Sequence, residues 1–340
     1  ISASAGLAQA SFAGLGHFPQ RPAYSEGLAI SADGSTAVGS ALLTSGPFNS
    51  TSGAYRWSES SGFVSAFDPL GASSSSSAVS ADGSVIVGWA TFSGVSSLGT
   101  QAFVYRVGLG TTLLGDLPTN PGSPNSYARG VSADGSVIVG IGQSAGGTEG
   151  FVYRVATGQF TPIGSLSAVR FGSWAYGVSG NGQVLVGASY SAPEQLEAMI
   201  WTQAHGLDGI GFLFASPSPK RSEVFGANFN GSVVVGRSTS PNAGSGMEAF
   251  RWTDDREMTG LGDLPGGPFS SVTYAVSGDG NVVVGSGSVE GGGPFGGSSP
   301  RAFIWDAQNG MRDLKQVLEA AGASLTGWTL REARGISADG

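Results

Sequence analysis

The chain has 340 residues, of which 58 are glycine and only 12% are charged, and its formal net charge at pH 7 is −8. Because no segment concentrates positive charge, nucleic acid and anionic membrane surfaces are not expected partners. The absence of cysteine excludes disulfides and thiolate metal sites, and no apolar run is long enough for a membrane-spanning helix.

The N-terminal residues 1–9 are small and mostly apolar, so we expect them to be the end of a leader or a flexible segment. A single domain is expected over 10–340. It begins with a strand near 10–18, where the residues LGHFP stand at 15–19.

An eleven-residue pattern, typified by AVSADGSVIVG at 78–88, then recurs along the whole chain. The other full copies cover 29–39, 130–140, 177–187, 226–236 and 275–285, and a partial copy covers 335–340. Each copy reads as two apolar strands joined by a tight turn, since Asp or Asn before Gly tolerates the backbone of a hairpin turn. The predicted turn residues are Asp33, Gly34, Asp82, Gly83, Asp134, Gly135, Asn181, Gly182, Asn230, Gly231, Asp279 and Gly280.

Two further motifs follow each copy and supply two more strands. One is an aromatic pair, as in AFVYR at 102–106, and the other resembles LGDLP at 114–118. The unit is thus a four-stranded antiparallel meander of about fifty residues, which is typical of a β-propeller blade. A parallel β-helix and a β-sandwich are the alternatives. One sheet cannot cover both of its own faces, so the blades must stack.

The predicted fold class is therefore all-β, a β-propeller of about fifty-residue four-stranded blades. The strand count favours seven blades, with the N-terminal strand closing a last blade truncated at 340, because closure removes exposed sheet edges. The alternative is a ring of six blades with the seventh motif outside it. A helical insertion is expected over 313–323, where apolar residues fall at helical spacing.

The recurrent triplet VSADGSVIVG, AFVYR and LGDLP resembles the HAF family of bacterial extracellular repeats, over nearly the whole chain. The resemblance implies a secreted or bacterial cell-surface protein, sometimes the passenger of an autotransporter. It implies no catalytic residues and no cofactor.

Catalytic and metal-binding patterns are weak in this sequence. The Asp of the repeat is replaced by Asn at 181 and 230, which preserves a turn but not a charge, so a ligand or catalytic role is disfavoured. The densest acidic cluster, 253–257, is expected to be a turn. Neither His17 nor His205 lies in the context of a nucleophile elbow. We therefore predict no metal site and no enzyme, although a glycosidase-like carboxylate pair stays open among Glu194, Glu197, Glu223, Glu290 and Glu332.

A binding site is expected where the sequence varies between repeats. In a meander the conserved turns share one end of each blade, and the long variable loops, such as 40–53, 89–101, 237–248 and 286–300, share the other. Aromatic and charged residues stand just before the innermost strand, at the channel mouth, beginning with Glu26. The candidate ligand-binding residues are Tyr127, Arg129, Trp174, Tyr176, Glu223, Tyr274, Glu332 and Arg334. Packing between blades is the alternative role for them.

Three functions are compatible with these patterns. The first is a non-enzymatic surface propeller that binds a glycan or a protein, and the second is a structural subunit that self-associates into a surface layer or fibre. The third is a secreted propeller glycoside hydrolase or lyase, which would need two carboxylates at catalytic separation.

Overall fold

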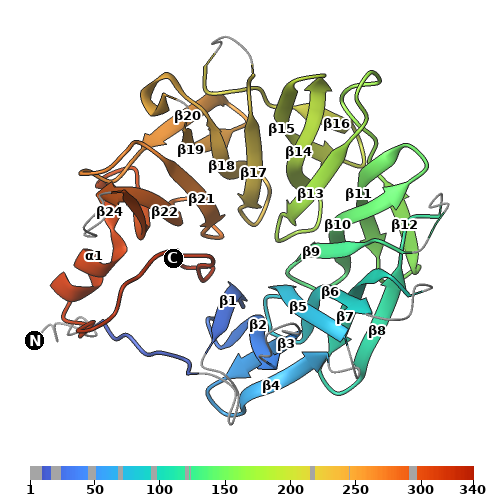
Figure 1. The fold of residues 1–340 in the computed structure, drawn as a ribbon, viewed down its shortest axis with the longest axis horizontal. Helices are drawn as coiled ribbons and strands as arrows, with labels where there is room; N and C mark the ends of the chain where they lie inside the picture. Colours follow the sequence, from blue (N-terminus) through green and yellow to red (C-terminus); the bar gives the residue numbers. More distant parts are fainter. Residues whose placement is uncertain are drawn as a thin grey trace, which may run out of the picture.

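Four-stranded antiparallel sheets surround a central axis in the computed structural model (Figure 1). The structure describes residues 10–16, 24–44, 51–67, 72–92, 98–118, 122, 124–214, 219–244, 246–290 and 297–340. Within them the sheets number six, and the chain is an all-β six-bladed propeller. In every sheet the neighbouring strands are consecutive in the chain, so each blade is a meander, as the repeats predict.

The first strand of each blade lies nearest the axis and the fourth lies at the rim (Figure 1). Blade 1 contains β1 (Ser25–Ile30), β2 (Thr36–Thr44), β3 (Thr51–Ser58) and β4 (Gly62–Phe67). Blade 2 contains β5 (Ala72–Val79), β6 (Val85–Phe92), β7 (Thr100–Arg106) and β8 (Gly110–Gly115). Blade 3 contains β9 (Tyr127–Val131), β10 (Val137–Ser144), β11 (Gly147–Arg154) and β12 (Gln159–Pro162).

The second half of the ring repeats this arrangement. Blade 4 contains β13 (Ser173–Val178), β14 (Val184–Ala192), β15 (Gln195–Thr202) and β16 (Gly206–Gly209). Blade 5 contains β17 (Ser222–Ala227), β18 (Val233–Thr239), β19 (Met247–Thr253) and β20 (Arg256–Gly262), with the 3₁₀ turn η1 (Pro241–Ala243) between β18 and β19. Blade 6 contains β21 (Ser271–Val276), β22 (Val282–Glu290), β23 (Ser298–Asp306) and β24 (Gly310–Asp313).

The prediction of seven blades was wrong. Residues 10–16 form no strand, and the rest of the expected N-terminal strand lies outside the described residues. The seventh copy of the motif, 335–340, forms a turn but belongs to no sheet, because no described strand pairs with it. Counting motifs therefore overestimated the number of blades, since a turn motif can form without the strands that usually flank it.

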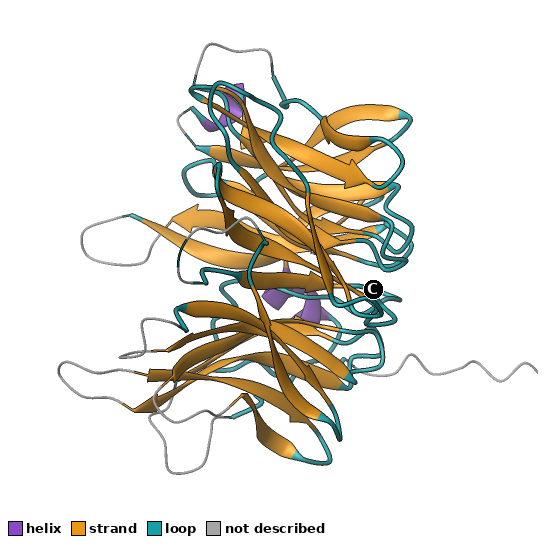
Figure 2. Ribbon diagram, turned by 90° about the vertical axis from the view of Figure 1, so that its right-hand side faces the viewer, coloured by secondary structure: helices purple, strands orange, loops and turns teal. Residues whose placement is uncertain are grey.

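The partial copy nevertheless occupies a defined place in the ring. The hairpin turns between the first and second strands gather at one end of the channel. There, each turn donates a backbone hydrogen bond to the next turn. The pairs run from Ala32 N to Ala81 O (3.1 Å), Ala81 to Ala133 (3.0 Å), Ala133 to Gly180 (2.9 Å), Asn181 to Phe229 (2.9 Å), Phe229 to Gly278 (3.1 Å), Gly278 to Ala338 (2.9 Å) and Ala338 to Ala32 (2.9 Å). The turn at 335–340 thus joins blade 6 to blade 1. In Figure 2 the turns gather at the end where the C-terminus is marked.

The hydrophobic core lies between neighbouring blades. The second strands contribute runs of buried valine and isoleucine, such as Val85, Ile86 and Val87. The first residue of each third-strand pair is fully buried; it is aromatic in five blades, as Phe103 is, and it is Met199 in blade 4. The second aromatic residue packs at the margin of the same clusters, for example Tyr105 and Trp305. Neighbouring blades from blade 1 to blade 6 thus cover the sheet faces between them, which explains the apolar strands without polar alternation.

The helical insertion is present but shorter than predicted. Helix α1 spans Leu314–Ala320 and begins at Asp313, whose carboxylate accepts a hydrogen bond from the Gln316 N–H (3.2 Å). It packs beside β23 and β24. Within the described part of the chain no helix is both long and apolar enough to cross a membrane.

The predicted variable loops are partly strand. β2, β6 and β22 extend into them as far as Thr44, Phe92 and Glu290, and β23 begins within the last of them at Ser298. The remaining parts of several loops lie outside the described residues. The walls of the central channel, by contrast, lie within the described residues.

Candidate binding site in the central channel

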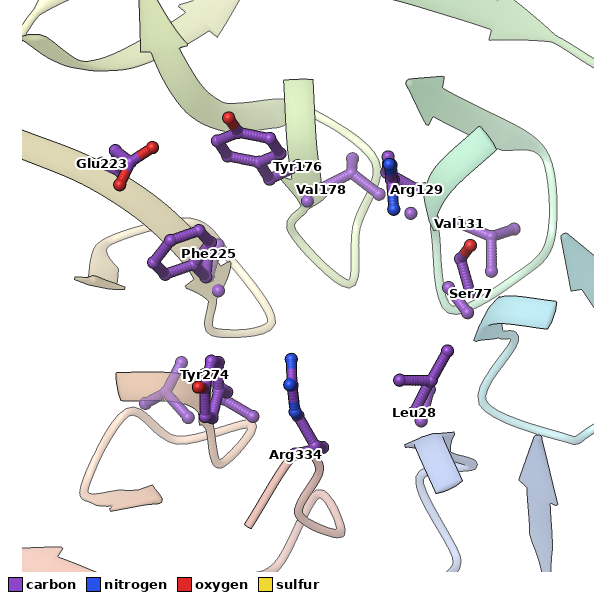
Figure 3. A pocket seen from close by; sticks show the side chains of 18 of the residues that line it. Leu28, Ser77, Arg129, Val131, Tyr176, Val178, Glu223, Phe225, Tyr274 and Arg334 are labelled. Carbon is purple, nitrogen blue, oxygen red and sulfur yellow. The ribbon is translucent and has the colours of Figure 1, made fainter. Parts of the chain in front are cut away.

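A cavity of about 530 Å³ lies in the channel between the innermost strands of the blades. Figure 3 shows side chains from several of these strands extending toward a common open space. The lining residues that carry large or polar side chains are Leu28, Ser77, Arg129, Tyr176, Glu223, Phe225, Arg237, Tyr274 and Arg334. The cavity is therefore built by the six innermost strands, by β18, which carries Arg237, and by the C-terminal segment that carries Arg334.

A β-bulge in each innermost strand places these side chains. In blade 3, Gly130 pairs with Val139 and Ala128 pairs with Gly140, so Arg129 is the extra residue of the first strand. A bulge leaves its extra residue unpaired and redirects its side chain. In the other blades the same register shift leaves one extra residue in the first strand: Leu28, Ser77, Tyr176, Phe225 or Tyr274.

The glycine that ends each repeat motif makes the bulge possible. A Cβ atom on Gly140 would lie 2.0 Å from the carbonyl oxygen of Tyr127, far inside any real contact distance. The second strand must therefore carry glycine opposite the bulge, since only glycine permits so close a backbone approach. The residue just before each motif is consequently the one that enters the channel.

Three aromatic side chains form an arc on one wall of the cavity. The ring centroids of Tyr176 and Phe225 are 5.5 Å apart, and those of Phe225 and Tyr274 are 6.3 Å apart. All three rings are partly accessible and come from blades 4, 5 and 6 in succession. Leu28, Ser77 and Val131 lie on the opposite side in Figure 3. The cavity thus combines a broad π surface with a wall of smaller side chains.

Glu223 is the acidic group of the cavity, and its side chain is only 4% exposed. Its carboxylate pairs with Arg237 through Nη2 (2.6 Å) and accepts a hydrogen bond from Arg237 Nε (2.7 Å). Arg221 adds a longer contact of 3.5 Å. Two guanidinium groups therefore compensate this buried carboxylate, and their contacts fix its orientation.

Arg334 enters the cavity from the C-terminal segment. Its Nη2 lies 2.5 Å from Glu332 Oε2 and 3.9 Å from Glu26 Oε1. The guanidinium carbon stands 4.3 Å from the centroid of the Tyr274 ring. This stacking extends the aromatic arc by a planar cation.

Arg129 lies elsewhere on the cavity wall and differs from the other arginines. Its guanidinium carbon is 5.5 Å from the centroid of the Tyr127 ring, and no carboxylate pairs with it among the described residues. The side chain is open to the channel, yet the surrounding protein lowers the pKa of its guanidinium by desolvation. A guanidinium remains charged even so, because its ordinary pKa is very high.

The two tyrosines of the arc are neutral hydrogen-bonding groups at physiological pH. Burial, with a smaller contribution from Glu223, raises the pKa of Tyr176 to about 12. Burial also raises the pKa of Tyr274, and Arg334 opposes that shift. Each hydroxyl can therefore both donate and accept a hydrogen bond to a ligand.

Five of the candidate residues chosen from the sequence line this cavity, namely Arg129, Tyr176, Glu223, Tyr274 and Arg334. The other three lie outside its lining. Tyr127 packs edge to face with Trp89 (5.7 Å between centroids), and Trp174 packs in the same manner with Tyr190 (5.3 Å). Glu332 pairs with Arg334, which lines the cavity.

Sequence reasoning missed Phe225, Arg237, Leu28 and Ser77. Three of them could have been found, because Leu28, Ser77 and Phe225 stand immediately before a copy of the repeat motif, as Arg129 does. Arg237 had no such signal. It follows the motif on β18 and reaches the cavity by pairing with Glu223.

The other residues considered as catalytic or metal-binding groups lie in turns or bond to nearby groups of the fold. The turn aspartates accept hydrogen bonds within their own hairpins, as Asp134 does from Ser132 Oγ (2.6 Å). Asp254 and Asp255 of the acidic cluster are exposed turn residues, and no group of three potential metal ligands occurs in the described ranges. Glu197 accepts a hydrogen bond from the Gly211 N–H (3.0 Å). His205 is exposed in a turn, and His17 lies outside the described residues.

Comparison with solved structures supports the fold. An oligogalacturonate lyase in complex with manganese matches with a TM-score of 0.53 and 12% identity, over 84% of this chain and 75% of that one. A TolB-like protein of Agrobacterium tumefaciens matches at 0.47 and 14%, over 70% and 80% of the two chains. TolB of Acinetobacter baumannii matches at 0.44 and 12%, over 87% and 74%.

The sheet topology defines the chain as a six-bladed β-propeller, and the likeness to the lyase agrees with that fold. At such low identity this likeness concerns the fold alone. Neither a family model nor a curated protein matches the chain. The resemblance to HAF repeats therefore stays a prediction.

Proposed function

We propose that this propeller is a non-enzymatic binding module that holds a glycan in its central channel, outside the cell or on a bacterial cell surface. The carrying observation is the arc of Tyr176, Phe225 and Tyr274 beside fixed charged groups. Aromatic faces that alternate with polar groups suit sugars, whose rings present apolar C–H faces and hydroxyl edges.

Binding is favoured over hydrolysis by the composition of the wall. Glycoside cleavage by the usual mechanism needs two carboxylates facing the scissile bond. Among the described lining residues Glu223 alone is acidic, and Arg237 and Arg221 both pair with it. Glu223 is thus compensated by arginines, and no second carboxylate lines the cavity among the described residues.

The rigid location of the arc also supports a binding role. The three aromatic residues stand at bulges of innermost strands, and the residues on either side of each bulge pair with the second strand of the blade. Side chains held by a scaffold lose little conformational entropy when a ligand binds.

The test is a glycan array probed with the purified chain and with Phe225→Ala. We expect the variant to lose binding by roughly tenfold or more, since a buried aromatic contact contributes a few kcal/mol. The matched control is Phe214→Ala, because Phe214 is half exposed on another surface. Absence of any bound glycan, or equal binding by Phe225→Ala and the wild type, would refute the proposal.

A further inference from the structure

The channel contains one positive charge that the described protein does not compensate. Of the charged groups that line the cavity or pair with its lining, four are arginines (Arg129, Arg221, Arg237, Arg334) and three are glutamates (Glu26, Glu223, Glu332). The site thus has one more arginine than glutamate, although the net charge of the whole chain is −8. Positive charge is therefore in excess at this one concave site.

Arg129 is the arginine of this set that has no acidic partner among the described residues. Arg237 and Arg221 share Glu223, and Arg334 has Glu332 at 2.5 Å, whereas no ion pair or side-chain hydrogen bond of Arg129 is present among the described residues. Each guanidinium carries five N–H donors in a planar fork that matches the geometry of an acid group. Arg129 therefore presents unused donors to the cavity.

The position of Arg129 is specified by the backbone. It is the bulged residue of β9, so its side chain is directed into the channel beside Val178 and opposite Arg334, as Figure 3 shows. Its ring partner within the described part of the chain, Tyr127, is outside the cavity lining. Partial desolvation of an uncompensated cation is unfavourable, and a bound anion would offset that cost.

We infer that the glycan bound in the channel is acidic, and that Arg129 binds its carboxylate or sulfate group while the aromatic arc contacts the sugar rings. This inference rests on the proposed function and adds the chemical class of the ligand. Arg129 acts as a specificity-determining residue, because it separates acidic from neutral glycans of the same shape.

The test compares matched ligands on matched variants. Binding of the wild type, Arg129→Gln and Arg129→Lys is measured by calorimetry for the acidic glycans that bind on the array, each beside its carboxyl-reduced or desulfated counterpart. We expect Arg129→Gln to weaken acidic ligands by at least tenfold and to leave the neutral counterparts unchanged. Arg129→Lys should weaken them less, because it keeps the charge but loses the planar fork.

The control for net charge is Arg154→Gln, since Arg154 is a surface residue of the same blade that contacts Gln203 Oε1 (2.6 Å). Melting temperatures of all variants confirm that they fold. The carboxyl-reduced and desulfated arms identify which acid group is bound. Wild-type binding should also weaken with added salt.

Two failures are distinguishable. If the array yields neutral glycans only, or if acidic ligands bind Arg129→Gln as tightly as the wild type, the inference is overturned while the glycan-binding function stands, provided that Phe225→Ala still loses binding. If no glycan binds the wild type, the proposed function itself fails, and the inference fails with it.

Discussion

The hairpin turn is the residue-scale unit of this protein. In the third copy Asp134 Oδ1 accepts hydrogen bonds from Ser132 Oγ (2.6 Å) and the Ser136 N–H (2.9 Å). Ser132 Oγ in turn accepts from the Val137 N–H (3.0 Å). Asn181 and Asn230 accept through the same oxygen, which explains why Asp and Asn alternate at this position.

Gly135 and Gly34 provide a matched test of this turn. Both have φ +73°, but a Cβ on Gly34 would meet nothing within 4 Å, whereas one on Gly135 would lie 2.6 Å from Val85 Cγ2. We expect Gly34→Ala to cost about 1–2 kcal/mol for backbone strain, and Gly135→Ala to cost about 1–3 kcal/mol more for overpacking.

Urea unfolding of the two glycine variants measures this difference, with Asp134→Asn as the control that keeps the turn. The asparagine variant should remain close to the wild type, as the natural Asn181 suggests. Equal losses for Gly34→Ala and Gly135→Ala would show that contact with blade 2 does not restrict this position.

At the scale of elements, a buried serine joins each of five blades to the one before it. The hydroxyl of Ser222, on β17, accepts a hydrogen bond from the Ala198 N–H (2.8 Å) and donates one to the Gly211 carbonyl (2.7 Å). Equivalent serines begin the other first strands or lie just before or within them, at Ser74, Ser126, Ser173 and Ser271. At each of these five interfaces, a serine of one blade therefore supplies a hydrogen-bond partner for a backbone N–H of the blade before it.

Ser222→Ala tests this contact between blades. The substitution leaves a buried N–H and a buried carbonyl without their partner, so we expect a loss of about 1–3 kcal/mol in the free energy of unfolding. The control is Ser25→Ala, because Ser25 has the equivalent bond to the Gly16 carbonyl (3.0 Å) in an exposed setting. If Ser222→Ala lowers the free energy of unfolding no more than Ser25→Ala does, the hydrogen bonds of Ser222 do not stabilise the contact between blades.

At the scale of the whole molecule, the turns form a ring and carry repeated carboxylates. Hydrogen bonds from Ser31 and Ser35 lower the pKa of Asp33 to about 2, and the same arrangement lowers the pKa of Asp82, Asp134 and Asp279. A carboxylate whose pKa is lowered on folding stabilises the native state above its unfolded pKa near 3.9, and that contribution is lost as pH falls toward the folded pKa.

We therefore expect the melting temperature to decrease as the pH is lowered from about 4 to about 2. A variant carrying Asp33→Asn, Asp82→Asn, Asp134→Asn and Asp279→Asn should show a smaller fall over this range, since asparagine does not titrate. Calorimetry at a series of pH values provides the comparison. Parallel curves for the two proteins would mean that these turns do not govern the acid response.

The blade could be read from the sequence because its determinants are local. An Asp-Gly or Asn-Gly step between apolar runs specifies a hairpin, and the glycine opposite the bulge is required by a carbonyl about 2 Å from its would-be Cβ, as at Gly88 and Gly285. The position just before each copy of the motif also identifies the residue of that blade whose side chain enters the channel. Arg129, Tyr176, Tyr274 and Arg334 were therefore accessible to sequence reasoning, although Tyr127 and Trp174 were included for the same proximity and lie outside the cavity.

The number of blades and the contacts between side chains in the site were decided only by the tertiary structure. The sequence by itself determined the meander, its turns and its buried faces, because these depend on residues within one repeat. Ring closure depends instead on the angles between blades and on what occupies the last position, where the turn at Ala338 joins Gly278 to Ala32 without a sheet of its own. The aromatic arc and the pairing of Arg237 with Glu223 likewise arise between strands, so only the assembled ring brings them together.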